Sequence, residues 1–285
     1  MALYRMKSKY RKRGGVLRYY GTATSLSQGR FDLAATSIGN YALFGGYSAV
    51  DAYDTSLVRT IPTSLSQTRN DVVATSIGNY ALFGGGYYSS YSATVDAYNT
   101  SLVRTIPTPL SRGRNSLAAT SIGNYALFGG GFNNGYTIDV VDAYDTSLVR
   151  TTPTALSQGH YYLAATSIGN YALFGGGLDN DSVVNAYNTS LVRTIPTSLS
   201  QGRGCLAATS IGNYALFGGG NYSYYGSTVY SNVVDAYDTS LVRTTPTVLS
   251  QGRYNLAATS IGNYALFGGG YYSSYSSVVD AYQLS

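Results

Sequence analysis

The sequence predicts an all-β repeat protein, and three observations support this fold class. The string ATSIGNYALFGG occurs six times without change, beginning at Ala35, Ala74, Ala119, Ala165, Ala208 and Ala258. The first glycines of the six GG pairs are 39, 45, 46, 43 and 50 residues apart, a period typical of one propeller blade per repeat. Tyr and Gly number 31 and 34 and Glu is absent, which suits pleated strands and tight turns. We therefore expect a six-bladed β-propeller of four-stranded antiparallel blades.

The first three strands can be placed from the pattern of the first repeat. Residues 33–38 alternate into a first strand, and Gly39-Asn40 form the two-residue turn that hairpins favour. Residues 41–46 follow as a second strand. After a variable stretch, residues 49–53 form a third. The small side chains of the first strand suit a crowded position beside the propeller axis.

The fourth strand is unevenly distributed along the chain. In the first repeat the chain turns at residues 54–56 into a strand at 57–60, which Pro62 ends because proline cannot donate to a ladder. The sixth repeat stops directly after its third strand, whereas residues 15–20 precede the first SLSQGR segment, where a fourth strand belongs. We expect this N-terminal strand to complete the last blade and close the ring, which hides two sheet edges.

Positive charge is concentrated at the N-terminus. Residues 1–18 hold seven Lys and Arg and no acid, while the remainder holds 11 Arg and 13 Asp, so the net charge of +5 comes from the tail. We expect a flexible or partner-docked tail at residues 1–15 and the propeller at residues 16–285. The tail could bind phosphates, an anionic membrane or an assembly partner, or could only aid solubility. Its basic residues are Arg5, Lys7, Lys9, Arg11, Lys12 and Arg13.

The absence of targeting signals in the sequence and the cysteine count restrict the compartment in which we expect the protein to occur. The sequence lacks an apolar run long enough for a signal-peptide core or a membrane span. We expect a protein without a signal peptide, either cytoplasmic or part of a virion-like particle. Cys205 is the single cysteine, which excludes an intramolecular disulfide and fits a reducing compartment.

Short motifs in each repeat resemble those of kelch-repeat β-propellers of bacterial or phage type. The motifs are a double glycine after an apolar strand, a Tyr-Asp pair, and a Pro followed by an Arg, as in Leu43-Phe44-Gly45-Gly46, Tyr53-Asp54, Pro62 and Arg69. The resemblance covers residues 16–285. The kelch tryptophan is absent, and Leu57 or Val58 occupies its region. The resemblance implies a six-bladed ring, and mutarotase-like kelch proteins use the cavity at its axis.

Sequence variation is confined to one face of the predicted propeller. Chain reversal at every turn places the second-to-third connection and the fourth-to-first connection together. The former is 3, 9, 10, 7, 14 and 9 residues long, and the two residues after the QGR slot form a different pair in every copy. These loops are rich in Tyr, Asn, Ser and Gly and lack Lys, Glu, Gln and Pro, as paratopes favour, although drift of tolerant loops is the alternative.

We predict that the variable face binds a protein or a glycan. The candidate residues are Phe31, Asp32, Tyr47, Asn70, Tyr87, Tyr88, Tyr91, Asn115, Phe132, Asn133, Asn134, Tyr136, Tyr161, Tyr162, Asp179, Asn180, Tyr222, Tyr224, Tyr225, Tyr254, Asn255, Tyr271, Tyr272 and Tyr275. The predicted function is a non-enzymatic recognition or scaffold module, with a structural or receptor-binding role in a larger, phage-like assembly. The alternative is a sugar-binding or sugar-modifying, mutarotase-like enzyme that uses the axial cavity.

Catalytic and metal chemistry find little support in the sequence. His160 is the only histidine, so the Cys/His clusters of zinc sites and the several His ligands of a copper oxidase are absent. We expect no cofactor, no metal and no catalytic residue. The oligomeric state is open.

A repeated arginine has two possible roles. The slot before each first strand holds Arg30, Arg69, Arg114, Arg203 and Arg253, with His160 in the fourth repeat. These side chains could form a positive collar for an anionic ligand such as an acidic sugar. Alternatively, they could pair with a third-strand Asp of a neighbouring blade, which we favour because charges repeated in every copy usually serve the repeat itself. The third-strand series is Asp51, Asp96, Asp142, Asp235 and Asp280, with Asn185 in the fourth repeat.

Overall fold

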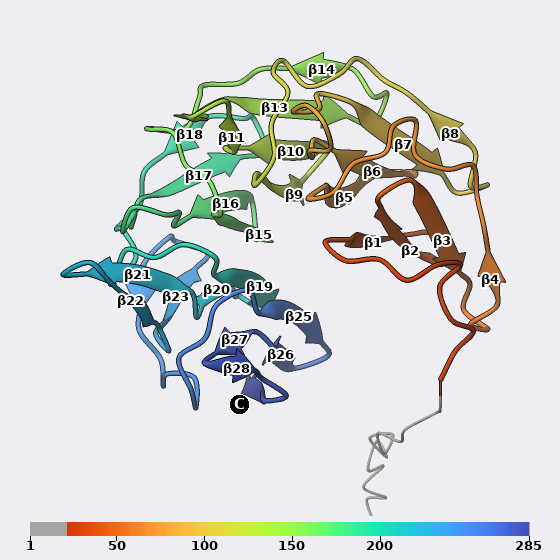
Figure 1. Ribbon diagram of the computed structural model, residues 1–285. Helices are drawn as coiled ribbons and strands as arrows, with labels where there is room; N and C mark the ends of the chain where they lie inside the picture. Colours follow the sequence, from red (N-terminus) through yellow and green to blue (C-terminus); the bar gives the residue numbers. More distant parts are fainter. Residues whose placement is uncertain (1–21, 285) are drawn as a thin grey trace, which may run out of the picture.

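A computed structural model describes residues 22–284, and every helical or strand element within them is a β-strand. The strands form six blades that follow one another in chain order around a common axis (Figure 1). The first strand of each blade packs beside that of the next, from β1 through β5, β9, β15 and β19 to β25. The all-β, six-bladed propeller that the sequence predicts is therefore confirmed.

Blade one shows the arrangement that the repeats share. Its strands pair antiparallel from the axis outward, with Gly39 at a φ of 53° in the first turn. They are β1 (Ala34–Ile38), β2 (Tyr41–Gly46), β3 (Ala49–Tyr53) and β4 (Arg59–Thr60). Blade two consists of β5 (Val73–Ile77), β6 (Tyr80–Gly84), β7 (Val95–Asn99) and β8 (Arg104–Thr105). Blade three consists of β9 (Ala118–Ile122), β10 (Tyr125–Gly129), β13 (Val141–Asp145) and β14 (Arg150–Thr151).

The later blades repeat this order. Blade four consists of β15 (Ala164–Ile168), β16 (Tyr171–Gly175), β17 (Val184–Asn188) and β18 (Arg193–Thr194). Blade five consists of β19 (Ala207–Ile211), β20 (Tyr214–Gly218), β23 (Val234–Asp238) and β24 (Arg243–Thr244). Within the described residues, blade six consists of β25 (Ala257–Ile261), β26 (Tyr264–Gly268) and β29 (Val279–Gln283). Residues 15–20, which we expected to supply its fourth strand, lie outside the described residues.

The fourth strand is shorter than the sequence pattern predicts. Leu57 adopts a left-handed φ of 61° and belongs to the turn, so that only Arg59 and Thr60 pair with β3. The Asp54 carboxylate holds this turn by accepting hydrogen bonds from the Ser56 and Val58 amides at 2.8 and 2.9 Å. A local side-chain bond of this kind competes with strand pairing and delays it by two residues.

The core lies between neighbouring blades. Five clusters of buried apolar side chains each combine residues of two successive blades. At each interface a Phe ring of one blade lies against the first GG glycine of the blade before it, so that a Cβ on Gly84 would lie 2.7 Å from the Phe128 ring. Close packing of backbone against an aromatic ring therefore requires glycine at this position.

The face of blade six that points away from blade five has no such cover from the described residues. Ile261 is 67% exposed, whereas its equivalent Ile211 in blade five is 5% exposed. Gly268 has only Val279 within 4 Å among the described residues, in place of a Phe ring. Blades six and one form the two ends of the array in Figure 1. The described residues thus contain five complete interfaces between blades.

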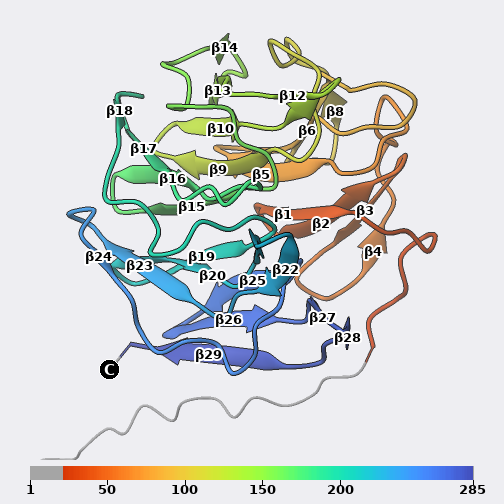
Figure 2. The same ribbon diagram turned by 60° about the vertical axis from the view of Figure 1, so that its left-hand side comes forward.

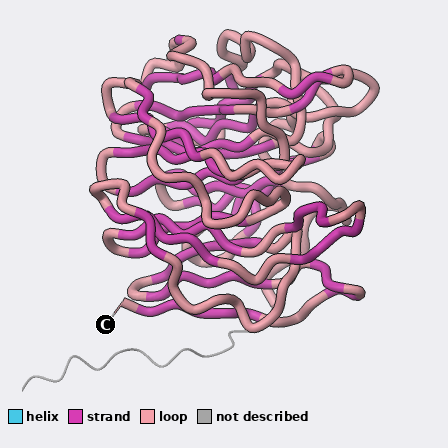
Figure 3. The backbone as a smooth tube through the Cα atoms, turned by 90° about the vertical axis from the view of Figure 1, so that its left-hand side faces the viewer, coloured by secondary structure: helices cyan, strands magenta, loops and turns pink. Residues whose placement is uncertain are grey.

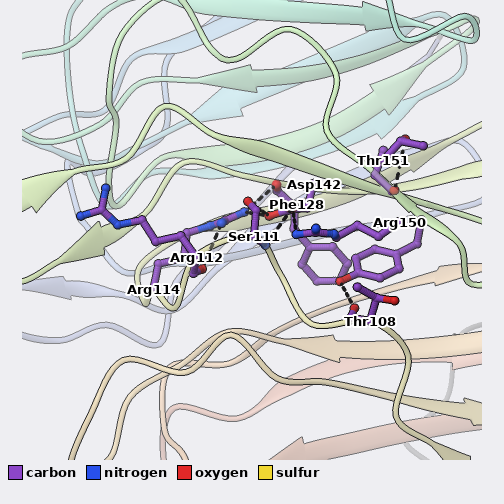
Figure 4. Close-up of polar contacts among 10 residues, drawn as sticks. Thr108, Ser111, Arg112, Arg114, Phe128, Asp142, Arg150 and Thr151 are labelled. Atoms are coloured by element: carbon purple, nitrogen blue, oxygen red, sulfur yellow. Dashed lines mark hydrogen bonds and ion pairs between the residues drawn. The ribbon is translucent and has the colours of Figure 1, made fainter.

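A buried ionic joint attaches five of the six linkers to the blade that follows, and Figure 4 shows the joint of blade three. The Asp142 carboxylate binds the Arg114 guanidinium at 2.8 Å and the Arg150 guanidinium at 3.1 Å. It also accepts hydrogen bonds from the amide and hydroxyl of Ser111 at 3.0 and 3.2 Å. Burial lowers the pKa of Arg114, while the adjacent carboxylate partly offsets that effect. The pair costs desolvation and is tolerated because its polar atoms are largely bonded to one another.

The same joint recurs through the ring and assigns the repeated arginines to structure. Arg30, Arg69, Arg203 and Arg253 bind Asp51, Asp96, Asp235 and Asp280, and all five linker arginine side chains are 0–3% exposed. Pairing with the third-strand Asp is confirmed, but the expectation of a neighbouring blade is wrong, because each Asp belongs to the blade that the linker enters. Arginines this deeply buried cannot form a collar for an anionic ligand.

Blade four replaces this joint with a different pair. His160 bonds through Nδ1 to Asp181, a loop residue, while Asn185 keeps the bond from the Ser157 amide at 2.9 Å. Burial alone would raise the pKa of Asp181, but hydrogen bonds from His160, the Val183 amide and Gln158 outweigh it and lower that pKa. In blade four the acid that contacts this linker slot therefore comes from the variable loop and not from the third strand.

The contrast between blades five and six predicts unequal effects of one substitution. Ile211→Asp places a carboxylate in a packed interface and should lower the free energy of unfolding by about 3 kcal/mol or more. Ile261→Asp changes a side chain that already faces solvent and should cost about 0.5 kcal/mol at most. Urea denaturation followed by tyrosine fluorescence measures both. Equal losses would show that blade one covers this face of blade six in solution.

The buried joint predicts a second pair of effects. Arg114→Met leaves the Asp142 charge buried with too few partners and should cost about 3–5 kcal/mol of unfolding free energy. Adding Asp142→Asn removes the unpaired charge and should recover part of this loss. Arg112→Met, two residues away on an exposed side chain, is the matched control and should cost about 0.5 kcal/mol or less. An Arg114→Met protein as stable as this control would refute the role of the joint.

Candidate functional site: the variable-loop face

The variable segments gather on one side of the ring. Three of them form small hairpins that project on the same side in Figure 2 and extend beyond the blades in Figure 3. The hairpins are β11 (Phe132–Asn133) with β12 (Tyr136–Thr137), β21 (Asn221–Tyr224) with β22 (Ser227–Tyr230), and β27 (Tyr271–Tyr272) with β28 (Ser274–Tyr275). We call this surface the variable-loop face.

Backbone hydrogen bonds hold the first variable position of the linker against the variable loop. Asn70 and Tyr87 exchange both bonds of an antiparallel bridge, at 2.8 and 2.9 Å. The same bridge joins Asn115 to Phe132, Gly204 to Asn221 and Tyr254 to Tyr271. Because main-chain atoms make these bonds, the side chains can change without loss of the support.

The second variable position has one unusual conformation in all six repeats. These residues have φ between 49° and 53°, in the left-handed region, and stand two positions before the first residue of the innermost strand. Three consecutive ones are joined by 2.9 Å amide-to-carbonyl bonds to the previous blade, from Tyr162, Cys205 and Asn255. The six are Asp32, Asp71, Ser116, Tyr162, Cys205 and Asn255. Left-handed backbone is uncommon outside glycine, so a framework that imposes it six times fixes these side chains in a defined place.

A cavity of about 770 Å³ opens at this position, and we call it the axial mouth. Its wall combines carboxylates, amides and phenols contributed by five of the six blades. The lining residues are Asp32, Asn70, Asp71, Tyr87, Tyr88, Asn115, Tyr162 and Asn255. A concave site with a few converging polar groups among aromatic rings is the usual form of a binding pocket.

Asp71 is the electrostatically distinct residue of the axial mouth. Its carboxylate accepts hydrogen bonds from the amide and hydroxyl of Ser116, each at 2.9 Å. Burial raises the pKa of Asp71 despite these bonds, and the nearby charge of Asp32 adds to the rise. The same surroundings affect Cys205, because burial and the charge of Asp71 raise the pKa of its thiol to about 11. A desolvated acid in a cavity is a feature of binding and catalytic sites.

Aromatic side chains form two groups beside the axial mouth. The first crosses blades two to four, with ring centroids 4.9 to 6.1 Å apart, and consists of Tyr87, Tyr91, Phe132, Tyr161 and Tyr162. The second crosses blades five and six at 5.4 to 5.6 Å and consists of Tyr230, Tyr254, Tyr271, Tyr272 and Tyr275. Rings packed across blade boundaries are held rigidly, and rigid aromatic surface binds partners at low entropic cost.

Several predicted residues lie outside these two groups. Phe31 and Tyr47 line a separate 280 Å³ pocket at blade one, and Tyr47 packs on Tyr88. Asn133 bonds to the Gly113 carbonyl in a supporting role. The Asn180 amide exchanges two hydrogen bonds with the Ser223 backbone and so ties the blade-four loop to that of blade five.

The residues at the hairpin positions differ in exposure. Asn134 and Tyr136 are exposed, Tyr222 is half-buried, and the rings of Tyr224 and Tyr225 pack on each other at 4.5 Å. Asp179 lines two pockets beside the blade-four loop.

The list of candidate residues omits two residues of the site, although both stand in the variable segments. Tyr230, at the end of a long loop, stacks on Tyr254 with an interplanar angle of 9°. Asp71 is the half-buried acid of the axial mouth. Its signal was present, because it occupies the same slot as Asp32 in the next repeat.

The structure bears in part on the predictions about the basic tail, membrane spans and metal sites. The basic residues at positions 5–13 lie outside the described residues. Among residues 22–284, no helix is long and apolar enough to cross a membrane. In the same part of the chain, no three His, Cys, Asp or Glu side chains gather as a metal-binding group would require.

Comparison with known proteins identifies the fold. No protein-family profile matches the sequence, and no curated protein matches it either. The solved structure of YjhT is similar, with a TM-score of 0.70 over 87% of this chain and 93% of that chain. The two sequences are 13% identical, so the likeness concerns the propeller fold alone.

The raised pKa of Asp71 predicts a pH-dependent cost in stability. The folded protein binds a proton at Asp71 more tightly than the unfolded chain, so the ionised group lowers the free energy of unfolding at neutral pH. The cost vanishes below the ordinary Asp pKa of about 3.9. We expect Asp71→Asn to raise the urea midpoint at pH 7 and to leave it unchanged near pH 3.

Asp139→Asn is the matched control, because Asp139 is exposed on the same face. This variant should match the wild type at both pH values. A lower midpoint for Asp71→Asn at pH 7 would contradict the assignment of Asp71 as a costly buried acid.

Proposed function

We propose that this protein is a kelch-like, non-enzymatic recognition module whose variable-loop face binds a protein or a glycan. The observation that carries the proposal is the separation of framework and side chain at the variable positions. Backbone bridges support the loops in the same way in several blades, while the side chains vary among the copies. Such an arrangement lets a binding surface change without altering the fold.

The chemistry of the surface supports recognition. Tyr88, Tyr136, Tyr224, Tyr225 and Tyr275 expose between 54 and 92% of their surface. Tyrosine combines a large apolar contact area with a hydroxyl and has few rotamers to lose, which makes it a frequent contributor to binding energy. Exposed rings concentrated on one face favour a binding surface over drift, which would distribute them singly.

The basic N-terminal residues complete the proposal. Residues 1–13 carry six positive charges in the sequence, which suits attachment to an anionic partner such as a larger, phage-like assembly. Anchoring and recognition would then be divided between the two parts of the chain.

A mutarotase-like or other sugar-modifying enzyme is the second candidate, and the desolvated acid in the axial mouth favours it. Acid–base chemistry needs a group whose pKa is moved toward neutrality, and burial moves that of Asp71 in this direction. The five linker arginines are buried in their joints and so are not available to a substrate there. Mutarotation of free hexoses, followed by polarimetry with wild type and Asp71→Asn, distinguishes the two functions.

The proposed function predicts that hairpin tyrosines determine binding. A combined glycan and surface-protein array should give hits for the wild type. Replacing Tyr222, Tyr224 and Tyr225 with Ala should weaken hits that use the β21–β22 hairpin by about tenfold or more, because aromatic anchors contribute over 1 kcal/mol each.

Tyr264→Ala is the matched control, since Tyr264 is 43% exposed but follows a constant Gly-Asn turn on the opposite face. A parallel variant, Tyr87→Ala with Tyr88→Ala, tests the blade-two loop. Hits that survive both sets of loop changes but fail with Tyr264→Ala would show that the opposite face binds.

A further inference from the structure

Among residues 22–284, the axial mouth contains negative charge without a matching cation. Asp71 and Asp32 both line it, and they lie close enough for the charge of one to raise the pKa of the other. The nearest repeated cations, the linker arginines, are each committed to a buried Asp in their own blade. A carboxylate held out of water without a counter-charge costs free energy, and a bound cation would remove that cost.

Amide oxygens add unused hydrogen-bond acceptors to the same cavity. The side-chain oxygens of Asn70 and Asn115 are buried, and neither accepts a hydrogen bond from the described residues. Both residues line the axial mouth beside Asp71. Buried acceptors are normally satisfied, so these two atoms mark a polar wall with spare hydrogen-bonding capacity beside the cavity. The carboxylates of Asp71 and Asp32 are the charged acceptors of the cavity, and the ligand that complements them carries N–H donors and positive charge.

We propose that the axial mouth receives a lysine or arginine side chain from a protein partner. The inference rests on the proposed recognition function and deepens it by naming the group that is recognised. Asp71 and Asp32 supply the counter-charge and accept the N–H groups. Tyr87, Tyr88 and Tyr162 line the same cavity and offer ring faces to an ammonium or guanidinium group.

The position of the cavity favours a protein over an amino sugar as the source of the cation. Aromatic groups from blades two to four and from blades five and six extend the contact surface well beyond the cavity. Protein interfaces place a charged or aromatic anchor in a central pocket and surround it with broader contacts. A single sugar amine would occupy the cavity and leave both aromatic groups uncovered.

Matched peptides test the proposal with the full-length protein. The probes are Gly-Tyr-Arg-Tyr-Gly and the same peptide with citrulline, which keeps the shape of arginine and loses its charge. We expect the wild type to bind the arginine peptide about tenfold more tightly in low salt, the ratio that one charge-assisted hydrogen bond provides. Asp71→Asn should abolish the preference, and Asp139→Asn should keep it. Added salt should narrow the difference.

Further arms separate the possible failures. Equal binding of both peptides, or an arginine preference that survives Asp71→Asn, overturns the cation site. A glucosamine oligomer that binds more tightly than its N-acetylated form, while neither peptide binds, assigns the cavity to amino sugars instead. Array hits that depend on the loop tyrosines but not on Asp71 leave the recognition function standing and refute only this inference. Thermal melts of each variant confirm that a loss of binding is not a loss of fold.

Discussion

The buried joint between linker and blade is the interaction on which the rest of the structure depends. The third-strand carboxylate fixes the linker arginine, the linker serine and the outer-strand arginine at once, as Asp142 does for Arg114, Ser111 and Arg150. Five of the six linkers contribute one or both of their variable residues to the wall of the axial mouth. The left-handed backbone at the second variable position is shared by five residue types in six repeats, so the framework imposes it. It does not follow from the preference of those residues.

This construction separates the interactions that hold the fold from those that contact a partner. Constant residues carry the joints, the Phe-on-Gly interfaces and the hairpin turns, and they lie within or between blades. Variable residues are supported by main-chain bonds and present their side chains outward or into the axial mouth. Asp71 illustrates the balance between stability and binding. Its carboxylate lowers the stability of the fold but lies where a ligand can contact it.

The strands could be predicted from sequence because each repeat contains the local signals that begin and end its strands. Gly-Asn turns, the Pro after the outer strand and the alternation of LAATSI act within a few residues. The fourth strand was predicted too long because the Asp54 side chain captures two amides of the turn. The stacking of Tyr230 on Tyr254 joins residues in two different blades, and no local pattern specifies such a contact. The faces of the variable residues were predictable for the same reason as the strands, but their grouping around the axial mouth depends on the rotation between blades.

The arginine of a joint and its aspartate belong to one repeat, the linker together with the blade that it enters. Blade four follows the same rule, since His160, Asp181 and Asn185 changed within a single repeat and its neighbours kept the common interface. Each repeat therefore pairs its own buried charges. It also presents the same apolar surfaces to the blade before it and to the blade after it. Recombination between repeats can exchange, duplicate or reorder such units without leaving a buried charge unpaired. A lineage of this protein can alter the arrangement of its surface loops by shuffling, at little cost in stability.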